Sequence, residues 1–331
     1  MITNTKVIIT KTLDPWWNLA VEEFLLGGVE ENQCILYLWQ NQNTVVIGRN
    51  QNPWRECRKE LLESEGGKLA RRLSGGGAVF HDTGNLNFTF LMKKEDYDLE
   101  RQVRVILNAV RNVGIQAEMS GRNDLTADGR KFSGNAFCFK KSGAYHHGTI
   151  LVNADMGKLS RYLQVSKEKI ASKGVASVES RVVNLIELQP ELTIEKMVDA
   201  LVPAFNEIYG TASSISDGAD LEREEVRELY KKYASWEWRY GEAPRFDIEL
   251  STRFLWGGVD LGLTLENSRI KSAAVFSDAM DEEFIRDLPQ HLNGQLFSSE
   301  AMAEAVLKID MGPERLAMQK DIAQWLREKG F

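Results

Sequence analysis

The sequence predicts a mixed α/β (α+β) protein: a large domain of mixed β-sheets with flanking helices, followed by a small C-terminal α/β domain. Hydrophobic residues make up 43% of the 331 residues and charged residues 27%, a balance typical of a folded core. Short strand-like runs alternate with amphipathic segments of helical spacing. The pattern resets after an aromatic cluster near residue 240. We therefore expect domains at residues 1–240 and 246–331, joined by a linker at 241–245.

The first helix has a clear beginning and end. Asp14 can cap its N-terminus, and Pro15 suits the first helical position. Two glycines, Gly27 and Gly28, can end it. These signals predict a helix that begins at Pro15.

Four strands are predicted around a cluster of three glycines. Ile35–Trp39 and Thr44–Gly48 are rich in β-branched and aromatic residues, which favour strands. A further pair of strands, Lys68–Leu73 and Asn87–Met92, is expected to bracket the glycine cluster.

Helical spacing and turn signals organise the middle of the chain. An apolar stripe predicts a helix over Leu99–Val113, and Asp128-Gly129 predicts a tight hairpin turn. Pro203 should kink or interrupt the helix that contains it. The other elements expected here are strands at Ile115–Met119, Leu125–Ala127, Arg130–Phe139 and Ala144–Val152, and helices from Asp155 through Leu163, over Thr193–Tyr209 and over Leu221–Tyr233.

The C-terminal domain is expected to begin as a small antiparallel sheet and to end in helices. Alternating apolar and polar residues predict the strands, and helical spacing follows them. The strands are Phe246–Phe254, Val259–Leu265 and Arg269–Phe276, and the helices lie around Asp281–Leu288, Ser299–Ile309 and Pro313–Lys329.

Composition excludes several classes of protein. A net charge of −7 and a pI near 5.4 argue against a groove for long nucleic acid. No apolar stretch reaches the roughly 18 residues of a membrane-spanning helix, and no signal-peptide pattern is present. The cysteines Cys34, Cys57 and Cys138 form no CxxC pair, which favours a reducing compartment. We expect a cytoplasmic protein, by default a monomer, with no nucleic-acid or membrane partner.

The segment RRLSGGGAVFHD, residues 71–82, is the most informative in the chain. Glycines let a backbone approach a ligand closely, and exposed amides beside Arg71 and Arg72 can bind an anion. A flexible hairpin with a solvated arginine pair explains the same residues. The segment has neither the Gly-Lys-Ser/Thr ending of a P-loop nor the GxGxxG of a dinucleotide site. It favours a compact anionic ligand outside both of these standard phosphate motifs.

A second group of polar residues follows downstream. Asp124 is a candidate oxygen ligand for Mg²⁺, which accompanies phosphates in protein sites. Lys131 lies between an Asp-Gly turn and a Ser-Gly pair, where its side chain projects into a cleft or remains a surface charge. His146 and His147 are adjacent on a predicted strand, so they face opposite ways and cannot bind one metal together. One of them lines a pocket, or it is a core histidine with satisfied hydrogen bonds.

Together these motifs resemble those of lipoate–protein ligase A. The motifs that carry the resemblance are DPWWNLAVEE, TVVIGRNQNPW, RRLSGGGAVFHD, GRNDL, GRKFSGNAF, HHGTILVNAD and SVESRVVNL, and it covers essentially the whole chain. The resemblance implies a fold related to biotin protein ligases and to the catalytic domains of class II aminoacyl-tRNA synthetases. It also implies that lipoate and MgATP form lipoyl-AMP and pyrophosphate, after which the lipoyl group passes to a lysine of an apo lipoyl domain. The acceptors would be E2 subunits of 2-oxoacid dehydrogenase complexes and the glycine cleavage H protein.

The resemblance implies roles for individual residues. Lys131 matches the family's active-site lysine, which contacts both the lipoate carboxylate and the α-phosphate. The expected ATP-binding residues are Arg72, Gly77, Ala78, Val79, Phe80, Asn123, Asp124 and Lys131. The expected lipoate-binding residues are Gly75, Gly76, Gly77, Lys131 and His147. Asp124 is the expected Mg²⁺ ligand, and residues 171–184 resemble a loop that orders over the nucleotide.

Cys138 leaves a second interpretation of the chemistry open. Related octanoyl- and lipoyl-transferases of this fold use a cysteine nucleophile and no ATP. Phe137 and Phe139 flank Cys138, so the other interpretation is a buried structural thiol on the strand face opposite both phenylalanines. Three hypotheses follow: an ATP-dependent ligase, an ATP-independent transferase that uses Cys138, and a non-catalytic lipoate-binding homologue. Arg72, Lys131 and the C-terminal domain favour the first.

Overall fold

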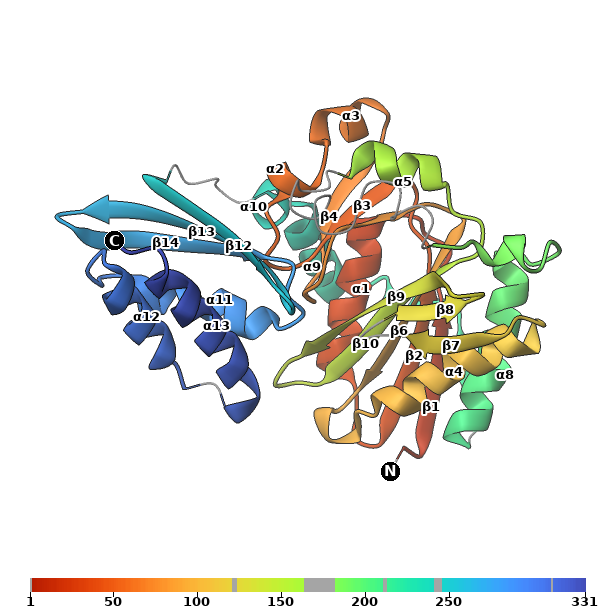
Figure 1. Cartoon of the computed structure of the whole chain (residues 1–331). Coiled ribbons are helices and arrows are strands. Elements are labelled where there is room, and N and C mark those ends of the chain that lie inside the picture. Colours follow the sequence, from red (N-terminus) through yellow and green to blue (C-terminus); the bar gives the residue numbers. More distant parts are fainter. Residues whose placement is uncertain (1, 121–123, 164–181, 211–212, 241–245, 311) are drawn as a thin grey trace. The chain divides into compact units, whose positions relative to one another are not determined.

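The computed structural model of the chain describes residues 2–120, 124–163, 182–210, 213–240, 246–310 and 312–331 (Figure 1). It confirms a mixed α/β architecture that divides into two units. The larger unit contains Met1–Ile47, Pro53–Arg72 and Ala78–Arg239, and the smaller contains Gly48–Asn52, Leu73–Gly77 and Tyr240–Phe331. The expected linker at 241–245 lies outside the described residues, so the expected domain boundaries stay a prediction.

A mixed sheet runs through the larger unit (Figure 1). Among the described residues it has eight strands in the order β11-β1-β2-β6-β10-β9-β8-β7. The strands are β1 (Asn4–Ile9), β2 (Gln33–Trp39), β6 (Asn85–Met92), β7 (Ala117–Ser120), β8 (Asp124–Ala127), β9 (Arg130–Phe139), β10 (Ala144–Leu151) and β11 (Ser214–Ser216). Because β1 and β2 are parallel neighbours, helix α1 (Pro15–Gly28) makes the crossover between them.

A second sheet holds the strands on either side of the glycine cluster. Within the described part of the chain it has the order β4-β3-β5. Its strands are β3 (Thr44–Ile47), β4 (Lys68–Arg71) and β5 (Val79–His81). The expected pairing of the strands that bracket the glycines is wrong, because β4 lies in this sheet and β6 in the larger one. Strand β5 separates them in sequence, and it is too short for alternation to reveal.

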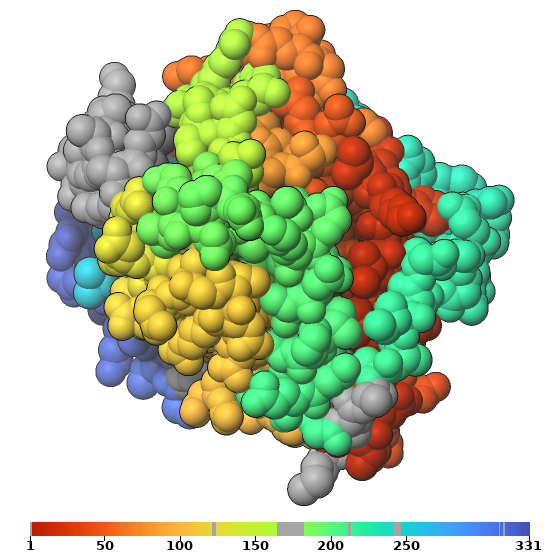
Figure 2. Space-filling model, turned by 90° about the vertical axis from the view of Figure 1, so that its right-hand side faces the viewer, coloured from red at the N-terminus to blue at the C-terminus, as the bar shows by residue number. Residues whose placement is uncertain are grey.

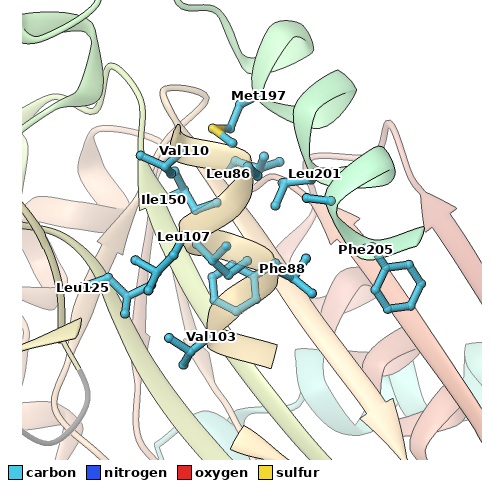
Figure 3. Packing of buried hydrophobic residues seen from close by; sticks show 14 of the residues in the cluster. Leu86, Phe88, Val103, Leu107, Val110, Leu125, Ile150, Met197, Leu201 and Phe205 are labelled. Atoms are coloured by element: carbon cyan, nitrogen blue, oxygen red, sulfur yellow. The ribbon is translucent and has the colours of Figure 1, made fainter. Parts of the chain in front are cut away.

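Two helices cover one face of the large sheet. These are α4 (Leu99–Asn112) and α8 (Ile194–Tyr209), which contact each other and lie side by side at the surface, α4 in gold and α8 in green (Figure 2). Figure 3 shows their buried side chains against β6 and β10. The labelled residues are Leu86, Phe88, Val103, Leu107, Val110, Leu125, Ile150, Met197, Leu201 and Phe205. This apolar layer is the main core of the larger unit.

Helix α8 runs through Pro203 without an interruption, so of the two expected effects, a kink or a break, the break does not occur. A proline inside a helix removes one backbone hydrogen bond and introduces a clash. The buried side chains of Met197, Leu201 and Phe205 hold the helix against the sheet on both sides of Pro203. Tertiary packing therefore overrides the local signal.

The other expected elements of the larger unit are confirmed. Asp14 Oδ1 accepts a hydrogen bond from the backbone N–H of Trp16 at 3.0 Å and caps α1. Asp128 and Gly129 have φ angles of 51° and 69° and turn the chain from β8 into β9. The remaining helices of this unit are α2 (Pro53–Glu56), α3 (Lys59–Ser64), α5 (Met156–Tyr162), α9 (Glu224–Ala234) and α10 (Trp236–Arg239).

The smaller unit has a sheet and a core of its own. Its strands β12 (Ile248–Phe254), β13 (Gly257–Glu266) and β14 (Arg269–Ser277) are antiparallel, and its helices are α11 (Glu282–Leu292), α12 (Ser299–Leu307) and α13 (Leu316–Arg327). Leu263, Phe284 and Val306 are fully buried between the sheet and the helices. The expected order of strands followed by helices is confirmed.

Two structural findings concern the cysteines and the possibility of membrane-spanning helices. The three cysteines are free and buried. No helix within the described ranges has the length and apolar character needed to cross a membrane.

Replacing Phe88 with alanine should destabilise the larger unit. Phe88 is fully buried in the apolar layer, and removing such a ring costs about 3–5 kcal/mol through lost burial and the cavity left behind. Chemical denaturation followed by circular dichroism measures the loss. Phe139→Ala is the matched control, because Phe139 is 38% exposed and its removal should cost much less. Equal losses in the two variants would contradict this assignment of the core.

Candidate functional site

Strand alternation gives the large sheet a polar face opposite the apolar one. His146 and His147 are neighbours on β10 and point to opposite faces. The Nδ1 atom of His146 lies 3.0 Å from Oε1 of Gln102 on α4. The Nδ1 atom of His147 lies 2.8 Å from Oε1 of Glu22 on α1. The predicted separation of the two histidines is therefore confirmed, and the face beneath α1 is the polar one.

Lys131 and Asp124 form an ion pair on this sheet. Their strands pair in a hairpin with a register shift between Leu125 and Thr126, and Lys131 Nζ lies 2.7 Å from Asp124 Oδ1. A side chain at Gly134 would place its Cβ 2.9 Å from Lys131 Nζ, so the ammonium group lies directly over bare backbone. Both charged side chains are more than one-third exposed, at 35% and 39%. A cation and an anion are thus held together where a ligand can reach them.

A buried polar network lies between α1 and the sheet. Glu22 is 1% exposed and accepts a hydrogen bond from Thr89 Oγ1 at 2.8 Å. Thr89 Oγ1 in turn accepts from Trp39 Nε1 at 3.1 Å. With His147, these residues join α1, β2, β6 and β10. Sequence reasoning missed Glu22, although a charged residue in the apolar run of α1 is a signal of this kind.

Arg72 supplies a second positive charge in the larger unit. Its side chain is buried, and Nη1 donates to the carbonyl of Val46 at 3.2 Å. Burial lowers the pKa of Arg72 to about 10, while interactions with Tyr145 and Glu22 act in the opposite direction. The guanidinium therefore keeps its charge at pH 7, in surroundings where charge–charge interactions are strong.

Two buried nitrogen atoms of this region lack hydrogen-bond partners among the described residues. They are Nε2 of His81 and Nδ2 of Asn87, whose residues are 4% and 1% exposed. The His81 ring lies 6.3 Å from that of Trp39, and Trp39 is the cross-strand neighbour of Asn87. Burial lowers the pKa of His81 to about 3. Buried polar groups are nearly always satisfied, so a ligand or water is expected beside these atoms.

The glycine cluster is part of the smaller unit. Gly76 has a φ angle of 86°, and its N–H donates to the carbonyl of Ala279 at 3.0 Å. A Cβ at Gly75 would collide with the same carbonyl oxygen, whereas a Cβ at Gly77 would meet open space. Gly75 and Gly76 are therefore required by a close backbone contact within this unit, and Gly77 leaves its surroundings open.

The remaining expected site residues differ in their burial and in whether the structure describes them. Val79 lies in β5, where it is the cross-strand partner of Val46 in β3. Val79 and the preceding residue Ala78 are both half-buried. Phe80 is buried, and its ring lies 5.5 Å from that of Tyr162. Asn123 and most of the expected loop at 171–184 lie outside the described residues. In the part of the chain that is described, no group of three His, Cys, Asp or Glu side chains is arranged to hold a metal ion.

Cys138 occupies a closed position. It is 1% exposed and is the cross-strand neighbour of Tyr145 on β10. Its neighbours in sequence pair with Ala144 and His146, so alternation places the thiol opposite both phenylalanines, as expected. Seven residues separate it from Lys131, a distance of about 20 Å along an extended strand. The thiol is therefore remote from the Lys131–Asp124 pair.

The fold and these charges define an α/β protein suited to an anionic small molecule. Residues 14–206 match the family model of the lipoyl protein ligase A/B catalytic domain, and residues 243–326 match that of the bacterial lipoate protein ligase C-terminus. The chain therefore belongs to the lipoyl protein ligase A/B family.

Solved structures agree with this assignment. P. falciparum LipL1 in complex with lipoate is 30% identical, with a TM-score of 0.86 over 98% of this chain and 100% of that chain. A bipartite lipoate protein ligase from Thermoplasma acidophilum, studied with its E2 lipoyl domain, is 25% identical, with a TM-score of 0.63 over 75% and 100% of the two chains. A lipoate-protein ligase A bound with ATP is 24% identical with a TM-score of 0.60 over 73% and 99%, and it shares the fold.

His146→Gln should weaken the pH dependence of stability. Burial lowers the pKa of His146 from 6.5 to about 3. As the pH falls through this window the unfolded chain takes up a proton that the folded chain refuses, so the free energy of unfolding falls by up to about 1.4 kcal/mol per pH unit. Glutamine does not titrate and removes this contribution. Urea titrations at several pH values between the two pKa values measure the slope.

The matched control is His291→Gln, in the smaller unit. His291 is only partly buried on α11, and its replacement measures how much exchanging a histidine for glutamine outside the apolar layer changes the slope. An unaltered slope in His146→Gln would show that His146 is protonated in the folded protein.

Proposed function

We propose that this protein is an ATP-dependent lipoate–protein ligase. In the first step a lipoate carboxylate oxygen bonds to the α-phosphorus of ATP, the bond to the bridging oxygen breaks, and pyrophosphate leaves. In the second step the amine of a lipoyl-domain lysine bonds to the acyl carbon of lipoyl-AMP, AMP leaves, and the amine gives up a proton. Family membership and the lipoate in the P. falciparum LipL1 complex support this proposal.

The observation that carries the proposal is the Lys131–Asp124 pair. The first step brings two anions together, so the protein must supply positive charge and correct placement. The Lys131 ammonium, over bare backbone at Gly134 and partly exposed, can contact a carboxylate and a phosphate at once. No general base is needed, because a carboxylate is already ionised at pH 7.

The other expected residues complete the proposal. Arg72 supplies a fixed positive charge for the phosphates, and the residues Ala78, Val79 and Phe80 offer backbone and apolar surface for ATP and the acyl chain. Gly75, Gly76 and Gly77 form a segment without Cβ atoms that lets the acyl phosphate approach the backbone closely. The N–H of Gly76 is already bonded to the carbonyl of Ala279, so this residue contributes through its small size. His147 contributes to the lipoate-binding surface, held in place by Glu22 at 2.8 Å.

Mg²⁺ fits this proposal in one binding mode. Mg²⁺ commonly binds through one or two carboxylates together with substrate phosphates. Asp124 is a partly exposed carboxylate beside the cation that would contact those phosphates, so it would hold the ion jointly with ATP. When bound, the ion neutralises phosphate charge and orients the oxygens.

We propose apo lipoyl domains as the protein substrates: E2 subunits of 2-oxoacid dehydrogenase complexes and the glycine cleavage H protein. The T. acidophilum ligase, which was studied with its E2 lipoyl domain, supports the first class. We place the reaction in the cytoplasm and assign it to a monomer. Three free cysteines are consistent with a reducing compartment.

Lys131→Ala should nearly abolish lipoyl-AMP formation. The loss should be on the order of 100- to 1,000-fold in rate, comparable to the removal of one donor that stabilises charge in a transition state. Lipoate-dependent pyrophosphate release measures it. Lys231→Ala, an exposed lysine on α9, is the control and should retain full activity. Near-normal release by Lys131→Ala would remove Lys131 from the proposed mechanism.

Cys138→Ser distinguishes the ligase from the ATP-independent transferase. The ligase needs no thiol, so the variant should keep its activity once correct folding is checked by thermal unfolding. A transferase with Cys138 as the nucleophile would lose all acyl transfer in the same variant. Transfer from an octanoyl or lipoyl donor in the absence of ATP, abolished by the serine, would favour that alternative.

A further inference from the structure

A chain of buried amides extends from helix α1 to the ring of His81. Asn18 Nδ2 donates to the carbonyls of Thr12 and Gln40, at 3.2 and 2.8 Å, so its amide orientation is set by backbone acceptors. Asn41 Oδ1 lies 3.0 Å from the same nitrogen. The amide has two hydrogens for these three acceptors, so one hydrogen is shared, and an oxygen of Asn41 faces this donor group. The nitrogen of Asn41 is then left to face Nδ1 of His81, at 3.1 Å.

This chain determines which nitrogen of His81 carries the proton. Asn41 Nδ2 can only donate, so His81 Nδ1 must accept. A neutral imidazole with an accepting Nδ1 has its hydrogen on Nε2. Burial, together with the positive charge of Arg72, lowers the pKa of His81 to about 3. The ring is therefore neutral at physiological pH and presents an Nε2–H donor.

The Nε2–H donor has no acceptor in the described part of the chain, although His81 is only 4% exposed. The largest charge interaction that acts on this ring comes from the guanidinium of Arg72. The second unsatisfied donor, Asn87 Nδ2, belongs to the strand neighbour of Trp39, whose ring lies 6.3 Å from the His81 ring. Two neutral donors and one guanidinium thus occur in the same region.

We propose that His81, as the Nε2–H tautomer, donates a hydrogen bond to an oxygen at the acyl–phosphate junction of the bound acyl adenylate. This inference rests on the proposed function. The acceptor is an oxygen of the acyl carboxyl group or of the α-phosphate. The alkyl chain and the dithiolane ring of lipoate offer no strong acceptor, so they do not satisfy a buried N–H.

Histidine NMR on the wild-type protein tests the tautomer without a mutation. The chain has four histidines, so the ring signals in ¹⁵N-histidine-labelled protein can be assigned by single substitutions. We expect His81 to show a protonated Nε2 and an unprotonated Nδ1 at neutral pH. Adding the sulfamate analogue of lipoyl adenylate should shift the Nε2–H signal strongly. An Nδ1–H tautomer, or an Nε2–H signal unchanged on saturation, would overturn the inference.

Binding of the same analogue measures the contribution of the donor. His81→Phe keeps a ring but removes the N–H, and should weaken binding on the order of 10- to 100-fold. His81→Gln restores a donor near the position of Nε2 and should recover most of the affinity. His291→Phe is the matched control and should bind normally. Thermal unfolding of each variant verifies that it is folded.

Separate titrations identify the acceptor oxygen. If His81 contacts the carboxyl group, His81→Phe weakens lipoate binding and spares AMP, and the reverse result assigns the contact to the phosphate. Unchanged affinity for lipoate, AMP and the analogue overturns the inference. A wild-type protein that binds none of these ligands instead overturns the proposed function, and the two failures are therefore distinguishable.

Discussion

The alternation of side chains along β9 and β10 is the constraint on which the rest of this molecule depends. Each strand presents one set of residues to α4 and α8 and the other set to α1, so neighbours in sequence have unlike surroundings. His146 lies in the apolar layer with Gln102, and His147 lies with Glu22. A shift of one residue in register would exchange the two sets and bury the polar face against an apolar layer.

The polar face of the sheet in turn determines which polar side chains the elements packed against it need. Glu22 and Asn18 lie on the buried side of α1, a largely apolar helix, because the strands beneath it offer hydroxyl, indole and imidazole groups that need partners. Among the described residues, the buried atoms still without a partner include His81 Nε2 and Asn87 Nδ2, which lie near Arg72 or Trp39. A site with such preset donors stabilises developing charge without reorganising at the moment of reaction.

Local signals in the sequence predicted most of the longer elements, whereas β1, β11 and the short helices α2, α3 and α10 were not predicted. Asp14, Pro15 and the Asp128-Gly129 turn act within a few residues, so α1 and the β8–β9 hairpin were predictable. Strand β5 was missed because three residues show no periodicity, and its absence led to the wrong pairing around the glycines. Pro203 does not break α8, because packing on the sheet, which local sequence does not show, holds the helix together.

The residues of the candidate site also fall into two groups: those that local sequence indicated and those that only the fold brings together. Lys131 and Asp124 were singled out by turn context and family motifs, and a hairpin brings them together. Glu22, Trp39 and Thr89 are distant in sequence and meet only when β2, β6 and β10 pair beneath α1. A charged residue in an apolar run marks Glu22 as unusual, but no local pattern shows which residues it contacts. The membership of the glycine cluster in the smaller unit likewise depends on contacts with Ala279, about 200 residues away.

The central claim is tested most directly by the intact mass of an apo lipoyl domain incubated with the wild-type protein, lipoate and MgATP. The account predicts a mass gain of one lipoyl group that requires both lipoate and ATP. A gain that occurs without ATP, or no gain under any condition together with no release of pyrophosphate, would contradict it.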